Sequence, residues 1–135
     1  MIHPNRFDGR VAVVTGGAGA FGTAIAGQLA AEGAGVVVAD LDLDAAGRVA
    51  SELGSNAVAC RLDVTQPYSV VEAMSVAEQQ FGGLDVLVNN AGLTHRITPL
   101  DELPDDAGIP WGDKVVVASV AHASRHPDYW KRRLL

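Results

Sequence analysis

The sequence predicts an α/β fold with three layers, in which a doubly wound parallel sheet of four to five strands has helices on both faces. Short runs rich in valine and alanine alternate along the chain with segments in which apolar residues recur at helical spacing. Some of these runs are continuously apolar, which is typical of strands buried on both faces. The helical segments are long enough to connect parallel strands, and right-handed connections of this kind build a doubly wound layer.

The expected strands and helices alternate from residue 10 to residue 89. The four strands, which share a high content of valine and alanine, are residues 10–15, 35–40, 57–64 and 85–89. Apolar residues at three- and four-residue spacing predict three amphipathic helices, over residues 21–29, 43–53 and 70–81. Each helix is followed by a glycine that can adopt a left-handed conformation, and these are Gly33, Gly54 and Gly82.

Length and composition exclude several classes of protein. The 135 residues, 48% of them apolar, fit one compact domain. No apolar run approaches the roughly 20 residues of a membrane span, and the N-terminal segment lacks the apolar centre of a signal peptide, so we expect a cytoplasmic protein. Cys60 is the only cysteine, which excludes a disulfide framework and a multi-thiolate metal site. The net charge of −6 argues against a nucleic-acid partner.

A glycine-rich turn, Thr-Gly-Gly-Ala-Gly-Ala-Phe-Gly, follows the first expected strand at residues 15–22. Gly17, Gly19 and Gly22 fit the pattern G-x-G-x-x-G between a strand and a helix. Glycine lets a pyrophosphate approach the backbone N–H groups at the positive end of the helix. Because no lysine follows the glycines, the P-loop pattern is not met and a dinucleotide is favoured over ATP. The alternative is a tight connection with close helix packing.

Asp40 ends the second expected strand, where a carboxylate can accept hydrogen bonds from both hydroxyls of an adenosine ribose. The same carboxylate would repel a 2′-phosphate. Neither Leu41 nor the glycine-rich turn supplies a lysine or arginine to neutralise such a phosphate, so NAD is favoured over NADP. The alternative for Asp40 is a solvated carboxylate at a strand end or a helix cap.

Three motifs in this order resemble the short-chain dehydrogenase/reductase family. Its members have T-G-x-x-x-G-x-G after the first strand, Asp-Val near the end of the third, and Asn-Asn-Ala-Gly after the fourth. Here these are residues 15–22, Asp63-Val64 and residues 89–92, with Ala20 in place of the middle family glycine. The resemblance covers residues 8 to about 106 and implies the amino-terminal half of a Rossmann-type fold, incomplete relative to the family.

The resemblance implies hydride transfer between a nicotinamide cofactor and an alcohol or carbonyl substrate. The residues that it assigns to cofactor binding lie near the ends of the four strands, and they are Thr15, Gly16, Gly17, Gly19, Phe21, Gly22, Asp40, Leu41, Asp63, Val64, Asn90, Ala91 and Gly92. It implies that Asp63 hydrogen-bonds the adenine amino group and that Asn90 supports the cofactor. The alternatives are a cap at the start of a helix for Asp63 and an Asx turn for Asn90.

Composition changes near residue 107, which divides the chain into a Rossmann dinucleotide-binding domain, 1–106, and a divergent tail, 107–135. The first part has five Lys and Arg against fourteen Asp and Glu, and the tail has five against two. In the tail we expect a fifth strand at 114–120 and a short terminal helix opened by Pro127.

The tail offers few candidates for the family's catalytic Ser, Tyr and Lys. No Tyr-x-x-x-Lys occurs in the sequence. Ser119 lies where the family's catalytic serine would end the fifth strand, and Tyr129 is followed four residues later by Arg133. A helix that starts at Pro127 has barely two turns, so the catalytic residues stay unassigned, with Ser119 and Tyr129 as candidates.

The sequence predicts no metal site, and two functions remain. His122 and His126 have the spacing of a zinc pair, but Ala123 stands where the metalloprotease motif needs glutamate.

The first of the two functions is an NAD-dependent oxidoreductase acting on a small alcohol or ketone, inactive as this chain alone. The second is a non-catalytic NAD-binding module, or a truncated or frame-altered product. An uncovered edge of the fourth strand would favour pairing with 114–120 or self-association.

Overall fold

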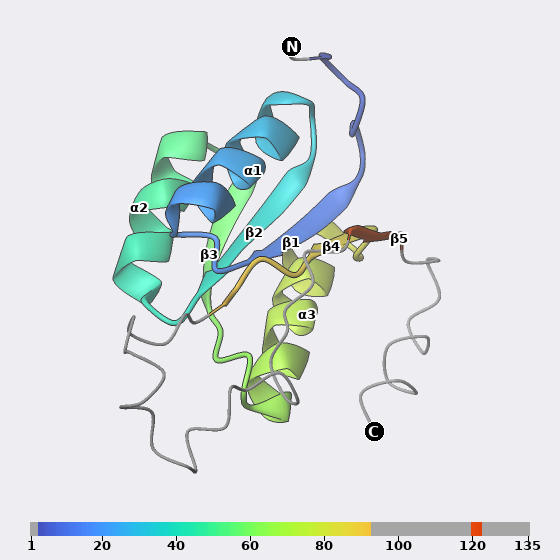
Figure 1. Cartoon of the computed structure of the whole chain (residues 1–135). Coiled ribbons are helices and arrows are strands. Elements are labelled where there is room, and N and C mark those ends of the chain that lie inside the picture. The colour runs from blue at the N-terminus through green and yellow to red at the C-terminus, as the bar shows by residue number, and fades with distance from the viewer. Residues whose placement is uncertain (1–2, 93–119, 123–135) are drawn as a thin grey trace, which may run out of the picture.

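The computed structural model describes residues 3–92 and 120–122 of the chain. Strands and helices alternate in the described part (Figure 1), and they are β1 (Val11–Thr15), α1 (Ala20–Ala31), β2 (Gly35–Asp40), α2 (Leu43–Leu53), β3 (Ala57–Arg61), α3 (Pro67–Phe81), β4 (Val86–Val88) and β5 (Val120–His122). The first seven elements agree with the expected order, and the bounds of β2 and α2 agree with the predicted ones.

The strands form one sheet in the order β3-β2-β1-β4-β5. The pairs β1–β2, β2–β3 and β1–β4 are parallel. After β1 the chain forms β2 and β3 on one side of β1 and then returns to form β4 on the other side (Figure 1). Such a reversal of strand order leaves a crevice at the carboxyl ends of the two strands that flank it, which here are β1 and β4.

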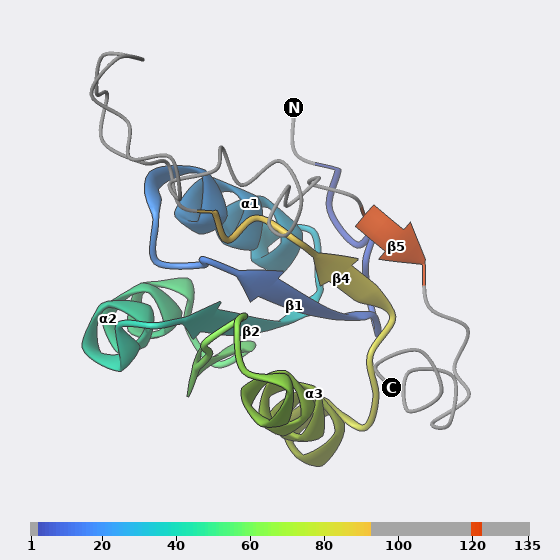
Figure 2. The same ribbon diagram turned by 60° about the horizontal axis from the view of Figure 1, so that its bottom comes forward.

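Helices cover both faces of the sheet, as the continuously apolar strands predict. All five residues of β1 are buried. On one face, side chains of β1 and β2 form a cluster with α1 and α2, and on the other face a second cluster joins the sheet to α3. Figures 1 and 2 show α1 and α3 on opposite sides of the sheet. Cys60 lies in the second cluster as a buried free thiol, whose pKa is raised by burial and by the Glu72 carboxylate.

The fifth strand differs from the expected one in direction. The sequence predicts a strand at 114–120 in a parallel sheet. Of this range only Val120 is among the described residues, and it belongs to β5, which runs antiparallel to β4 with Val88 opposite Val120. A strand whose partner is the edge of a sheet can satisfy the same backbone groups in either direction, so pattern alone does not set its direction. Residues 114–119, the boundary near residue 107 and the expected terminal helix lie outside the described residues.

A buried carboxylate fixes the segment before β1. Glu32, at the carboxyl end of α1, is fully buried. It pairs with the Arg6 guanidinium and accepts hydrogen bonds from the Gln28 side-chain amide and, at 3.4 Å, from the backbone amide of His3. The Glu32 carbonyl oxygen also accepts a hydrogen bond of 2.8 Å from the Phe7 amide. These contacts hold residues 3–7 across the end of α1.

The pKa of Glu32 predicts an acid-sensitive contribution to stability. Burial raises this pKa, but the contacts from Gln28, His3 and Arg6 outweigh burial and lower it below the ordinary value of 4.5. A carboxyl group whose pKa is lower in the folded state stabilises the fold above its unfolded pKa, and this stabilisation is lost as the pH falls through the folded pKa.

We therefore expect Glu32→Gln to have a smaller loss of unfolding free energy than the wild type between pH 5 and pH 3. Urea denaturation at a series of pH values measures this difference. The control is Glu52→Gln, which removes the same charge from an exposed position of α2. A change in pH dependence seen only in Glu32→Gln would assign the effect to the buried carboxylate. Equal pH dependence of the wild type and Glu32→Gln would contradict the prediction.

Candidate functional site

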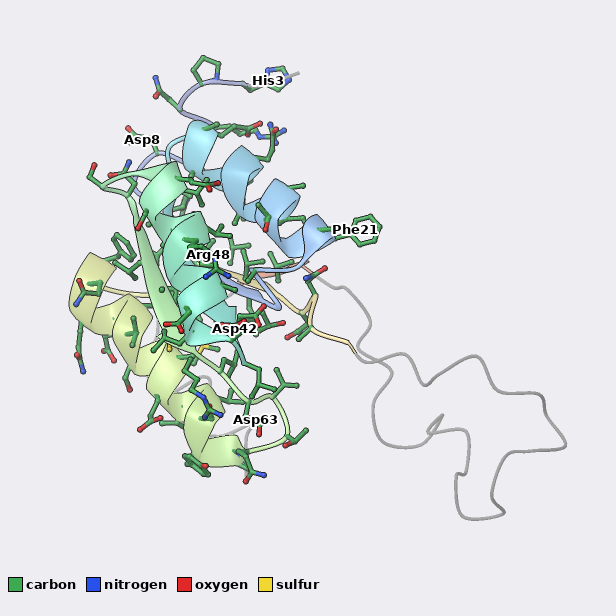
Figure 3. The ribbon with its side chains drawn as sticks, turned by 90° about the vertical axis from the view of Figure 1, so that its left-hand side faces the viewer. His3, Asp8, Phe21, Asp42, Arg48 and Asp63 are labelled. Carbon is green, nitrogen blue, oxygen red and sulfur yellow. The ribbon has the colours of Figure 1, made fainter. Side chains whose placement is uncertain are left out.

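The expected site residues come together at the carboxyl ends of the parallel strands. Figure 3 places Phe21, Asp42 and Asp63 at this end of the molecule, and His3 and Asp8 at the opposite end. The glycine-rich turn follows β1, Asp40 ends β2, Asp63 follows β3, and Asn90 follows β4. Ligands of open α/β sheets bind at this end, beside the point where the strand order reverses.

Three glycines of the turn are required by the packing of the chain itself. A β-carbon on Gly22 would lie 2.0 Å from the carbonyl oxygen of Gly16, and one on Gly17 would lie 2.8 Å from Cγ1 of Val38. Gly16 has a φ of 61°, which a residue with a side chain rarely adopts. The alternative that we left open, a tight connection with close helix packing, therefore explains these three glycines.

Gly19 is different, because the described chain does not require a glycine there. Its φ is −75° and its ψ is 170°, and a β-carbon on it would make only an ordinary contact of 3.4 Å with the Gly16 oxygen. Gly19 is also the N-cap of α1, where it makes no side-chain hydrogen bond, and the first turn of the helix has no acidic residue. The amino end of α1 thus presents backbone N–H groups and a partial positive charge without a capping side chain, which fits an anionic group.

A hydrogen-bond network joins the glycine-rich turn to the residues after β4. The buried Thr15 hydroxyl donates to the Val88 carbonyl at 3.2 Å and accepts from the amides of Asn90 and Ala91, each at 3.0 Å. The Asn90 side-chain amide donates to the carbonyls of Thr15 and Gly16, each at 3.1 Å. These contacts run between β1 and β4, which differs from the local Asx turn that we considered for Asn90.

Two backbone amides fix the orientation of the Asp40 carboxylate. Oδ2 accepts from Ala18 N of the glycine-rich turn at 3.0 Å, and Oδ1 accepts from Asp42 N at 3.1 Å. The cap of α2 is Asp42, whose side chain accepts from Ala45 N, so Asp40 is not a helix cap. Because a carboxylate has about four acceptor positions, Asp40 can still accept hydrogen bonds from the hydroxyls of a ribose.

Exposed apolar side chains lie beside Asp40 and Asp63. Leu41 is 58% exposed and Val64 is 46% exposed, although both are large hydrophobic residues. Oδ1 of Asp63 accepts from the amide and the hydroxyl of Thr65, at 3.0 and 2.7 Å, while the N-cap of α3 is Gln66. Leu41 and Val64, both predicted as cofactor contacts, thus directly follow Asp40 and Asp63 in the sequence. Asp63 also shapes the turn that leads to α3.

Arg61 lies beside Asp40 in the sheet, and the sequence pattern did not predict it. Neither Leu41 nor the glycine-rich turn has a positive charge that could lie beside Asp40. In the sheet, Arg61 is the register partner of Asp40, because β3 pairs with β2 in parallel. The expected strands do not give this register, because aligning the ends of 35–40 and 57–64 would place Val64 opposite Asp40, whereas β3 ends at Arg61.

The remaining candidates lie mostly outside the described residues. This applies to Ser119, Tyr129, Arg133 and His126, whereas His122 belongs to β5. Phe21, predicted as a cofactor contact, is 78% exposed in the first turn of α1, and Gly92 is exposed after β4. Among the described helices, none has the length and apolar character needed to cross a membrane.

Comparisons with known proteins agree with this architecture. The sequence profile of the family described as short chain dehydrogenase matches residues 10–125. The chain is 45% identical over 100 residues to an uncharacterized oxidoreductase of Bacillus subtilis, covering 72% of this chain and 38% of that protein. It is 40% identical over 102 residues to a galactitol 2-dehydrogenase of Agrobacterium fabrum, covering 76% of this chain and 40% of that protein. The chain thus spans about two-fifths of the length of these relatives.

Solved structures give the same result. The 3-ketoacyl-(acyl-carrier-protein) reductase of Brucella melitensis, complexed with NADH, matches with a TM-score of 0.70 and 37% identity, over 74% of this chain and 41% of that one. A hydroxysteroid dehydrogenase of Escherichia coli matches with a TM-score of 0.62 and 41% identity, over 64% of this chain and 38% of that one. The family profile covers well over half of the chain, and the chain therefore belongs to the short-chain dehydrogenase family.

Proposed function

We propose that this chain binds NAD at the carboxyl ends of β1, β2 and β4, as the nucleotide-binding part of an oxidoreductase acting on an alcohol or carbonyl substrate. The observation that carries this proposal is the amino end of α1. Gly19 leaves it without a capping side chain, although nothing in the packing of the described chain requires glycine there. A diphosphate is the group that such a helix end accommodates. The reductase of Brucella melitensis, which is similar in fold, was crystallised with NADH.

The choice of NAD over NADP rests on Asp40. The two backbone amides hold its carboxylate at the end of β2, where the adenosine ribose of a bound dinucleotide would lie. A carboxylate accepts hydrogen bonds from the 2′- and 3′-hydroxyls and repels a 2′-phosphate. When bound, NAD supplies the carbon that accepts a hydride. Leu41 and Val64 would contact the adenine, and the network of Thr15 and Asn90 would hold the glycine-rich turn in place.

Gly19→Ala tests the proposal. The added methyl group fits the folded chain, so we expect a midpoint of thermal unfolding close to that of the wild type. The same methyl group would stand between a diphosphate and the backbone amides, so we expect the Kd for NAD to rise by about tenfold or more. Isothermal titration calorimetry measures the affinity, and thermal unfolding followed by circular dichroism measures stability.

The matched control is Gly47→Ala on α2, where a β-carbon meets no atom within 4 Å. This variant should bind NAD as the wild type does. No heat with NAD on folded wild-type protein, or equal affinities of Gly19→Ala and the wild type, would refute the proposed site.

A second candidate is a nucleotide-binding module without turnover, because the sequence contains no Tyr-x-x-x-Lys. An assay of NAD reduction with a panel of secondary alcohols distinguishes the two. Turnover that is lost in Tyr129→Phe would support the oxidoreductase, and NAD binding without turnover would support the module.

A further inference from the structure

We propose that Arg61 determines how strongly this site discriminates against a 2′-phosphorylated nucleotide, by placing a positive charge beside Asp40. The inference rests on the proposed function, since it concerns the ribose end of the same nucleotide site. Asp40 supplies the repulsion of a 2′-phosphate, and Arg61 supplies an attraction that partly offsets this repulsion. The expected result is a site that prefers NAD and still binds NADP with measurable affinity.

The sheet brings the two side chains to the same place. Asp40 and Arg61 are the last residues of β2 and β3 and lie opposite each other in the parallel register. Just beyond this pair, the Leu62 amide donates to the Asp40 carbonyl at 2.8 Å, so the two strand ends stay paired to their last residue. Neighbouring strands in a sheet are about 4.8 Å apart, which places the two α-carbons next to each other.

Both side chains leave the sheet on the same face. Val36 and Val38 belong to the cluster that α1 and α2 cover, and Ala57 and Ala59 pack against that cluster. Successive side chains of a strand alternate between faces, so Asp40 continues the first series and Arg61 the second. The contact of Asp40 with the Ala18 amide confirms this face for the carboxylate.

The Arg61 guanidinium has no carboxylate partner within the described residues. The two ion pairs of that part of the chain use Arg6 with Glu32 and Arg10 with Asp85. The Asp40 carboxylate is held by backbone amides. Arg61 is also exposed, so a ligand can reach it. An exposed guanidinium beside a ribose site suits a phosphate, because its planar donors match phosphate oxygens in pairs.

NAD and NADP are suitable probes because they differ only in the 2′-phosphate, so the ratio of their Kd values isolates this group. We expect Arg61→Gln to weaken NADP binding by about tenfold, the usual effect of losing one charged hydrogen bond, while the Kd for NAD changes by less than about twofold. Isothermal titration calorimetry measures both constants. Raising the salt concentration should reduce the effect, since the contact is ionic and exposed.

The control is Arg48→Gln, which removes the same charge from an exposed position within α2 and not from β3. It should leave the ratio of the two Kd values unchanged. Asp40→Asn removes the carboxylate that repels the 2′-phosphate. In this background Arg61→Gln should again weaken NADP binding and leave NAD binding unchanged, which separates the attraction by Arg61 from the repulsion by Asp40.

Two results would overturn the inference. Equal effects of Arg61→Gln on NAD and NADP, with unchanged thermal unfolding, would show that Arg61 is a solvated charge on an edge strand and leave the proposed function intact. Absence of NAD binding to the folded wild-type protein would refute the proposed function, and this inference with it.

Discussion

Replacing Gly22 by alanine should lower the free energy of unfolding by about 3 kcal/mol or more, the upper part of the range for overpacked sites. The added β-carbon would lie 2.0 Å from the Gly16 oxygen and 2.7 Å from the α-carbon of Gly17. Both obstacles are backbone atoms, and no flexible side chain can move aside to make room. The first turn of α1 would have to separate from the glycine-rich turn, so NAD binding should be lost together with stability.

Chemical denaturation of the wild type and Gly22→Ala measures the effect. Gly47→Ala is the matched control, because it adds the same methyl group to an open position within α2, where alanine should stabilise the helix by about 0.5–1 kcal/mol. A Gly22→Ala variant as stable as the wild type would show that the first turn of α1 does not pack on the glycine-rich turn as described.

The second large effect is expected for Thr15→Val, with a loss of about 1–3 kcal/mol of unfolding free energy. Valine keeps the shape of threonine, but it removes the hydroxyl that accepts from the amides of Asn90 and Ala91 and donates to the Val88 carbonyl. Leaving a buried polar group without a partner costs about 1–3 kcal/mol. The Ala91 amide loses its partner in this variant, whereas the Asn90 amide and the Val88 carbonyl keep the 3.0 Å hydrogen bond between them.

Thr15→Ser is the control, because it restores the hydroxyl and removes one methyl group. We expect Thr15→Ser to recover most of the lost stability in urea denaturation. Equal destabilisation by serine and valine would indicate that the methyl group, and not the hydrogen-bond network, fixes Thr15.

Much of the fold follows from local patterns in the sequence. The continuous apolar runs of β1 and β2 require cover on both faces, and the structure provides it with α1 and α2 on one face and α3 on the other. Proline is common in the first turn of a helix and glycine just after its last turn. α3 follows this rule, because it begins at Pro67 and is capped at its carboxyl end by Gly82, which has a left-handed conformation with φ 84° and ψ 12°. These features depend on neighbours along the chain, and a single sequence contains them.

The features that sequence reasoning missed depend on which strands become neighbours. The position of Arg61 beside Asp40 follows from the register of β3 on β2. The contacts of Asn90 with Thr15 and Gly16 span about 75 residues of chain. The direction of β5 depends on an edge that accepts a strand either way. The sequence contains the glycine pattern typical of phosphate-binding turns. Only the packing shows that Gly19, unlike Gly16, Gly17 and Gly22, is not required by the fold itself.

The bond between the Asp40 carboxylate and the Ala18 amide has a consequence for engineering coenzyme preference. In the proposed nucleotide site, Asp40 is the position to change in a redesign toward NADP, yet truncating its side chain would also free the Ala18 amide within the glycine-rich turn. Such a design would also loosen the glycine-rich turn, to which we propose that the diphosphate binds. A better design would add positive charge on β3, near Arg61, and keep at position 40 a side chain that accepts a hydrogen bond from the Ala18 amide. Such a design would shift the preference toward NADP and leave the glycine-rich turn in place.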